Sequence, residues 1–145
     1  MKNILAAAFI ILCFAFVADD PTITFNNTTG TASLIGGGHK NASKYEDETY
    51  SCKFPLTNTG NTTLKIRKIV QTGWNPAPKD AAAKYSSVAI CTFSNIPAGG
   101  KGNISIIVNS DYLNWLKTQN TKAYSLTFSV ESNNASGPVT LTVTN

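Results

Sequence analysis

Two adjacent runs of alternating apolar residues decide the fold, and both lie within residues 49–71: TYSCKFPLTNTGNTTLKIRKIVQ. In the first run, every second position is apolar, at Tyr50, Cys52, Phe54 and Leu56. A period of two places these side chains on one face of a β-strand. The sequence therefore predicts a strand over the first ten of these residues, with one face in a core and the other in water.

The second run predicts a partner strand over residues 63–71, with apolar residues again at alternate positions. The phase of the alternation slips at Arg67-Lys68-Ile69, which predicts a β-bulge. Between the runs, Asn58-Thr59-Gly60-Asn61 is typical of a hairpin turn, in which Gly60 is free to adopt a positive φ.

The same period recurs on both sides of this pair, with turn residues between the runs. We expect further strands over residues 22–25, 31–35, 87–93, 102–108, 124–131 and 139–144. Strands of this length and spacing predict an all-β fold: a single immunoglobulin-like β-sandwich of seven or eight antiparallel strands.

Three further segments depart from the strand pattern. Residues 74–78 carry two prolines and are not expected in a central strand, because proline cannot donate to the ladder. A helical turn is expected over residues 80–85, capped by Asp80. A short helix is expected through Thr118, with Ser110 or Asp111 as its N-cap.

The N-terminus has the layout of a secretory leader. A basic start at Lys2 is followed by the uncharged apolar run of residues 4–17, which is too short to span a bilayer. We expect a signal peptide over residues 1–18 and the sandwich domain over residues 19–145, with cleavage after Ala15 as an alternative. The protein would then be secreted, with no membrane span in the mature chain, because no second run reaches the required length. The other interpretation is an uncleaved anchor.

Loss of the leader would remove Cys13 and leave Cys52 and Cys91. Both lie at inward-facing strand positions, and an even cysteine count in an exported chain favours a disulfide. We therefore expect a bridge between the two sheets. Two separate buried thiols are the alternative.

Composition argues against several functional classes. The chain carries 12 basic and 8 acidic residues, and the basic ones are too scattered for a nucleic-acid-binding face. The single histidine, His39, cannot form a metal site alone, and no serine lies in a nucleophile elbow. Glu46-Asp47-Glu48 lacks the spacing of a calcium loop. We expect no cofactor, no metal and no enzymatic activity.

Six asparagines begin the glycosylation pattern Asn-x-Ser/Thr, which is a modest excess over chance for this composition. In a secreted eukaryotic protein this pattern predicts N-glycosylation. The candidate sites are Asn27, Asn41, Asn61, Asn103 and Asn134, with Asn26 overlapping the first of them.

Aromatic residues supply the one binding hypothesis with a mechanism. Trp74 lies beside prolines, Tyr85 follows in the next loop, and Trp115 lies on the expected short helix. An exposed planar ring can stack on the apolar face of a sugar at low entropy cost. The alternative is that both tryptophans close the ends of the sandwich core.

Two families share features of this chain. The run from Phe54 to Asn61, followed by Leu64-Lys65-Ile66 and the turn Ile96-Pro97-Ala98-Gly99-Gly100, resembles the family 49 carbohydrate-binding modules, with Tyr50 and Trp74 at comparable places. The same features, with the closing strand over residues 124–133, also resemble Hydin-like (ASH-type) immunoglobulin domains. Both resemblances imply a sandwich without catalysis.

Two functional hypotheses follow. The first is a secreted module that recognises extracellular polysaccharide, cellulose-like if the first resemblance holds, through Trp74, Tyr85 and Trp115. The second is a structural or adhesion protein that binds a cell-surface protein through a sheet face or edge.

Overall fold

The computed structural model of the chain describes residues 20–36, 48–79 and 83–145. The expected leader lies outside these residues, and so does the beginning of the helical turn expected over residues 80–85. The same is true of four residues singled out above: His39, Asn41, Glu46 and Asp47.

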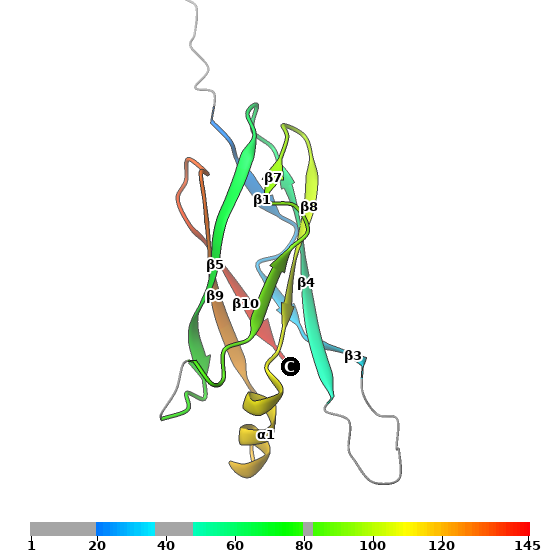
Figure 1. Cartoon of the computed structure of the whole chain (residues 1–145), viewed down its shortest axis with the longest axis vertical. Coiled ribbons are helices and arrows are strands. Elements are labelled where there is room, and N and C mark those ends of the chain that lie inside the picture. The colour runs from blue at the N-terminus through cyan, green and yellow to red at the C-terminus, as the bar shows by residue number, and fades with distance from the viewer. Residues whose placement is uncertain (1–19, 37–47, 80–82) are drawn as a thin grey trace, which may run out of the picture.

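Two five-stranded sheets pack face to face in an elongated sandwich, and the single described helix lies at one end of it (Figure 1). The first sheet contains β1 (Ile23–Phe25), β3 (Ser33–Gly36), β4 (Thr49–Asn58), β8 (Lys101–Ile107) and β6 (Val88–Cys91). The second sheet runs in the order β2 (Thr29–Thr31), β10 (Val139–Thr144), β9 (Ser125–Ser132), β5 (Leu64–Asn75) and β7 (Asn95–Ile96). The all-β sandwich predicted from the alternation is confirmed.

The strand count and one strand direction differ from the prediction. The described residues form ten strands, because β2 and β7 are only three and two residues long and leave no periodic signal. β2 also pairs with β10 in parallel, whereas all strands were expected to be antiparallel. The long connection from β2 through the rest of the chain makes such parallel pairing possible.

The core consists of the side chains that the alternation placed inward. Phe54 and Leu56 of β4 are 1% exposed, and the inward residues of β8, β9 and β10 are fully buried. Burying each such side chain stabilises the fold by about 1.5–3 kcal/mol. The fully buried aliphatic and phenylalanine residues of these three strands are Ile104, Ile106, Leu126, Phe128, Val130, Leu141 and Val143.

The turn at residues 58–61 does not close a hairpin, so that prediction was wrong. β4 and β5 belong to different sheets, and the turn carries the chain across the sandwich. Gly60 is needed for close approach, since a Cβ here would collide with the Asp20 carbonyl oxygen. Among the described glycines, positive φ occurs instead at Gly99 and Gly137.

The bulge predicted in β5 is confirmed. Its register against β9 shifts between Ile66 and Lys68, and shifts again between Gln71 and Gly73. Each extra residue bends the strand and increases its twist.

β5 also runs further than expected, through Asn75. Trp74 and Asn75 pair with β9, although they precede a proline. β7 pairs only with Leu64 and Lys65, so the far half of β5 is a sheet edge. A strand edge tolerates the following Pro76, which is consistent with the expectation that this segment is not central.

The short helix α1 (Ser110–Thr118) confirms the prediction, with a different cap. Asn109, one residue before the expected start, accepts a hydrogen bond from the Tyr112 backbone N–H at 3.1 Å. No helix in the described part of the chain is long and apolar enough to cross a membrane.

Asn58 is fully buried at the crossing between the sheets. Its Oδ1 accepts hydrogen bonds from the backbone N–H groups of Thr22 at 3.3 Å and Gly60 at 3.1 Å. Its Nδ2 donates to the carbonyl oxygens of Thr62 at 2.7 Å and Ile96 at 2.9 Å. One side chain therefore satisfies four backbone groups from three segments.

The two cysteines do not form the expected disulfide, and both are free thiols. Cys52 pairs with Ile106 and Cys91 with Ile104, so both flank β8 in the same sheet. Two strand spacings and an offset of two residues along the strands separate their Cα atoms by about 12 Å, beyond the ~7 Å limit for a bridge. The inward orientation was correct, but the assignment of β6 to the opposite sheet was wrong.

Replacing Asn58 should destabilise the fold strongly. We expect Asn58→Ala to lower the free energy of unfolding by about 3 kcal/mol, because one buried and three partly buried backbone groups lose their partner. Urea unfolding measures this change. The exposed Asn27 is the matched control, and Asn27→Ala should stay within about 0.5 kcal/mol of the wild type. Equal stability of the two variants would contradict the role assigned to Asn58.

The chain over residues 19–145 should unfold at the same urea concentration with and without reductant. After unfolding without reductant, iodoacetamide should modify both Cys52 and Cys91, as read by mass spectrometry. In the folded protein, burial raises the pKa of both thiols, so each stays protonated at neutral pH and reacts slowly. A midpoint that falls on reduction would show that the two cysteines are bridged.

Candidate binding groove

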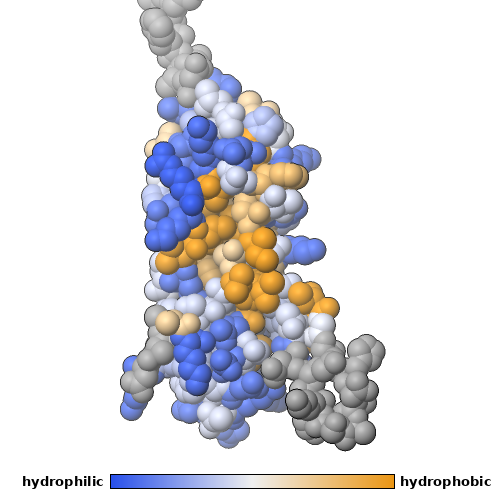
Figure 2. All heavy atoms as spheres, in the orientation of Figure 1, coloured by the Kyte–Doolittle hydropathy of each residue, from blue (hydrophilic) through white to orange (hydrophobic). Residues whose placement is uncertain are grey.

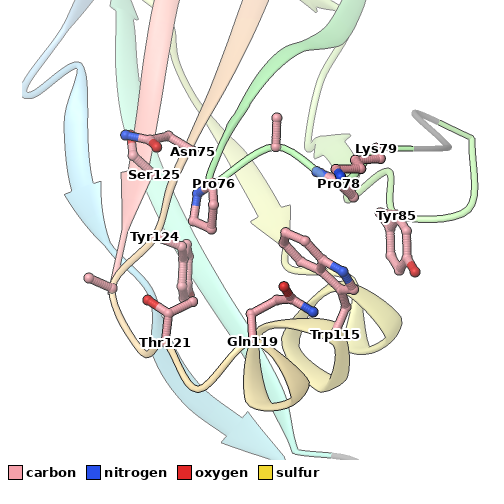
Figure 3. Close-up of a pocket in the computed structure, with 12 residues that line it drawn as sticks. Asn75, Pro76, Pro78, Lys79, Tyr85, Trp115, Gln119, Thr121, Tyr124 and Ser125 are labelled. Carbon is pink, nitrogen blue, oxygen red and sulfur yellow. The ribbon is translucent and has the colours of Figure 1, made fainter.

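A groove of about 980 Å³ lies at the helical end of the sandwich, where β5 ends and β9 begins. Figure 3 shows Trp115 rising from α1 at its centre, with Tyr85 on one side and Tyr124 on the other. The groove is lined by Asn75, Pro76, Ala77, Pro78, Lys79, Tyr85, Trp115, Gln119, Thr121, Ala123, Tyr124 and Ser125.

Two of the three aromatic residues singled out from the sequence line this groove together. Tyr85 precedes β6 and Trp115 lies on α1, yet their ring centroids are 6.0 Å apart with the planes tilted by 44°. Both side chains are half-buried, so each ring packs on the core and still reaches the groove. Two of the three candidate stacking residues therefore lie side by side in the structure.

Trp74 has a different place. It is half-buried against the core and does not line the groove. Its indole Nε1–H donates a hydrogen bond to the backbone carbonyl oxygen of Tyr85 at 3.2 Å. Trp74 is thus a positioning residue that holds the Tyr85 backbone.

Tyr112 packs against all three aromatic residues that line the groove. It is fully buried, and its ring stacks on that of Trp115 with centroids 5.7 Å apart and planes 27° apart. Its ring also meets Tyr85 at 6.5 Å and Tyr124 at 6.0 Å, both edge-on. Its hydroxyl donates to the Pro76 carbonyl oxygen at 2.8 Å, which fixes one wall of the groove.

Burial keeps the two innermost tyrosines neutral. Desolvation raises the pKa of Tyr112 to about 12, with a smaller contribution from Tyr124. Desolvation likewise raises the pKa of Tyr124 to about 12, and nearby Tyr50 and Cys52 contribute to that rise. The Tyr124 hydroxyl has no hydrogen-bond partner among the described residues.

Asn109 ties the loop that carries Tyr85 to the helix that carries Trp115. Besides capping α1, its Nδ2 donates to the carbonyl oxygens of Lys84 at 3.2 Å and Ser86 at 3.0 Å. The backbone on both sides of Tyr85 is therefore bonded to the start of α1. Sequence reasoning missed this role, although an asparagine just before a predicted helix is a recognised capping signal.

The polar part of the lining is almost uncharged. Asn75, Gln119, Thr121 and Ser125 offer hydrogen-bond donors and acceptors, and Lys79 is the one charged residue among the lining residues that the structure describes. The described residues contain no cluster of three histidine, cysteine or acidic side chains that could hold a metal ion. Glu48, from the acidic cluster, accepts a hydrogen bond from the Tyr50 hydroxyl at 3.1 Å.

The predicted glycosylation sites have different surroundings. Asn27, Asn61 and Asn103 are exposed. Asn134 is only 7% exposed, its Oδ1 accepts from the Ile23 backbone N–H, and its Nδ2 donates to the Gly137 carbonyl oxygen. A glycan attached at that Nδ2 does not fit this buried arrangement, so the prediction for Asn134 conflicts with the structure.

A second surface feature lies along β6, the last strand of the first sheet. Val88, Ile90 and Phe93 are 50–58% exposed, and we call them the apolar edge surface. Figure 2 shows apolar side chains gathered along the middle of this face of the molecule. Strand edges in natural proteins usually carry charges or prolines that discourage pairing, and β6 carries neither.

No family model matches the chain, and no curated protein matches its sequence. Among solved structures, it is similar to a protein of unknown function from Porphyromonas gingivalis, with 14% identity and a TM-score of 0.60. That match covers 90% of this chain and 49% of the other, so the chain spans about half the length of that protein.

The chain is also similar to the ASH/PapD-like domain 7 of human CEP192, with 13% identity and a TM-score of 0.52, covering 99% of this chain and 95% of that one. At such identities the likeness concerns the fold alone. The expected resemblance to ASH-type immunoglobulin domains is supported at that level, and the resemblance to family 49 carbohydrate-binding modules finds no support. The chain has an immunoglobulin-like sandwich fold with an ASH/PapD-like domain among its structural neighbours.

Proposed function

We propose that the chain is a non-catalytic binding module that recognises polysaccharide in the groove at the helical end of the sandwich. The observation that carries this proposal is the meeting of Tyr85 and Trp115, from separate elements, in one groove. Two rings set side by side offer the apolar faces of sugar units a surface on which to stack.

The rest of the groove suits the same ligand. Sugar hydroxyls need hydrogen-bonding partners around the stacking surface, and Asn75, Gln119, Thr121 and Ser125 supply neutral ones. The rings are pre-organised by Trp74, Tyr112 and Asn109, so binding has little ordering entropy to offset. The lining residues that the structure describes include no carboxylate, histidine or cysteine that could act as acid, base or nucleophile, and this supports binding rather than catalysis.

Removing either ring should weaken polysaccharide binding. We expect Trp115→Ala and Tyr85→Ala each to lower the affinity of the chain over residues 19–145 for oligosaccharides by about tenfold, because a stacking surface is lost. Isothermal titration against cello- and chito-oligosaccharides, with galacturonate oligomers beside them, measures this effect.

Phe93→Ala is the matched control, since Phe93 is exposed on the apolar edge surface and does not line the groove. Its affinity should equal that of the wild type. The proposal fails if no member of the panel binds, or if Trp115→Ala binds as tightly as the wild type while its circular-dichroism spectrum is unchanged.

A second candidate function is supported by the apolar edge surface. An unprotected strand edge presents backbone N–H and C=O groups that an extended segment of a partner protein can pair with. Val88 and Ile90 point outward on β6, because their neighbours Ala89 and Cys91 pair with the buried Ile106 and Ile104. This arrangement fits an adhesion or structural protein that binds another protein through a sheet edge.

A second copy of the chain presents the same edge and is therefore a simple probe. We expect weak self-association at high protein concentration, measured by analytical ultracentrifugation, which Ile90→Lys should abolish because it replaces an apolar contact between the paired strands with like charges that repel each other. Thr140→Lys adds the same charge at an exposed position of the inner strand β10 and should leave the association unchanged. A wild type that stays monomeric at all concentrations would count against this candidate.

A further inference from the structure

We infer that the groove prefers polysaccharides that carry negative charge, such as polymers of uronic acids or sulfated sugars, over neutral glucans. This inference rests on the proposed function and names the class of ligand for the same site. It follows from the distribution of charge around Tyr85 and Trp115.

Among the residues that the structure describes, the lining of the groove has one positive charge and no carboxylate. Lys79 lines it directly, and the other polar lining residues are amides and hydroxyls. None of the four described acidic residues, which are Asp20, Glu48, Asp111 and Glu131, is in the lining. Asp111 is the nearest of them along α1 to Trp115, exposed one helical turn before it. Asp80, next to Lys79, lies outside the described residues.

Two further lysines, Lys84 and Lys122, lie beside the lining residues. The Lys84 Nζ lies over the Tyr85 ring at 5.4 Å from its centroid, so one face of this ring already contacts an ammonium group. Lys122 is exposed between two lining residues, Thr121 and Ala123.

This pattern fits an acidic sugar better than a neutral one. A sugar ring that stacks on Tyr85 or Trp115 leaves its substituents at the rim of the groove. A carboxylate or sulfate on the sugar would contact the lysine ammonium groups there. Exposed charges of this kind act additively and are screened by salt over about 10 Å at 0.1 M ionic strength. The preference should therefore be clear at low salt and weaken as salt is added.

The test compares ligands of equal length that differ in charge. Hexagalacturonate and cellohexaose are titrated into the chain over residues 19–145 at 50 mM and 500 mM sodium chloride. We expect hexagalacturonate to bind about tenfold more tightly at the lower salt concentration, with the difference reduced to about twofold at the higher. A sulfated hexasaccharide in a third arm distinguishes sulfate from carboxylate as the anionic group.

Two variants locate the effect. Lys79→Gln should reduce the preference for hexagalacturonate severalfold, because it removes the charge in the groove. Lys65→Gln removes one equally exposed charge from β5, at the opposite end of the strand from the groove, and should preserve the preference. Trp115→Ala keeps every charge and should weaken binding of both hexasaccharides.

The possible failures are distinct. Equal affinity for the two hexasaccharides, or tighter binding of cellohexaose, overturns the anionic preference and leaves the proposed function standing. Binding of hexagalacturonate that survives in Trp115→Ala shows attraction to the basic surface in general and overturns the inference. If neither hexasaccharide nor any other sugar of the panel binds, the proposed function fails and the inference fails with it.

Discussion

The buried amide of Asn58 is the constraint on which the sandwich depends. A chain that passes from one sheet to the other must leave its ladder, and the backbone groups freed at that point cannot remain unpaired in a dry core. Asn58 has two donors and two accepting lone pairs, and all four are used on backbone groups. These hydrogen bonds fix the crossing without a covalent cross-link. They also hold the segment around Ile96 against Asn58.

The alternation of apolar residues allowed the long strands to be predicted, because it reflects burial on one face, as at Phe54 and Leu56. Strand partners were not predictable in the same way. The turn after Asn58 has the residues of a hairpin, but tertiary hydrogen bonds, including those of the Asn58 side chain and of the Thr59 backbone N–H to Thr22, lead the chain across instead. The same limit explains the cysteines: a period of two shows that Cys91 faces inward, and it does not show to which sheet β6 belongs.

For the groove, the sequence predicted that aromatic residues would form the binding surface, but it did not predict how all of them are arranged. Tyr85 and Trp115 were singled out as potential stacking rings, and they lie together. Trp74 could not be distinguished from them, because its role depends on a hydrogen bond between its ring and a backbone carbonyl 11 residues away. Tyr112 and Asn109 act through contacts of the same non-local kind, which leave no spacing pattern.

Because β8 separates the two thiols, each of them can report on a different opening motion of the fold. Cys91 is half-buried on the outermost strand, and its Sγ donates to the Phe93 carbonyl oxygen, so fraying of that strand alone would expose it. Cys52 lies between the sheets, against Gly30 of the opposite one, and becomes accessible only when the layers part. The rates at which a small alkylating reagent labels the two sulfurs would therefore distinguish local from global opening in the unmodified protein.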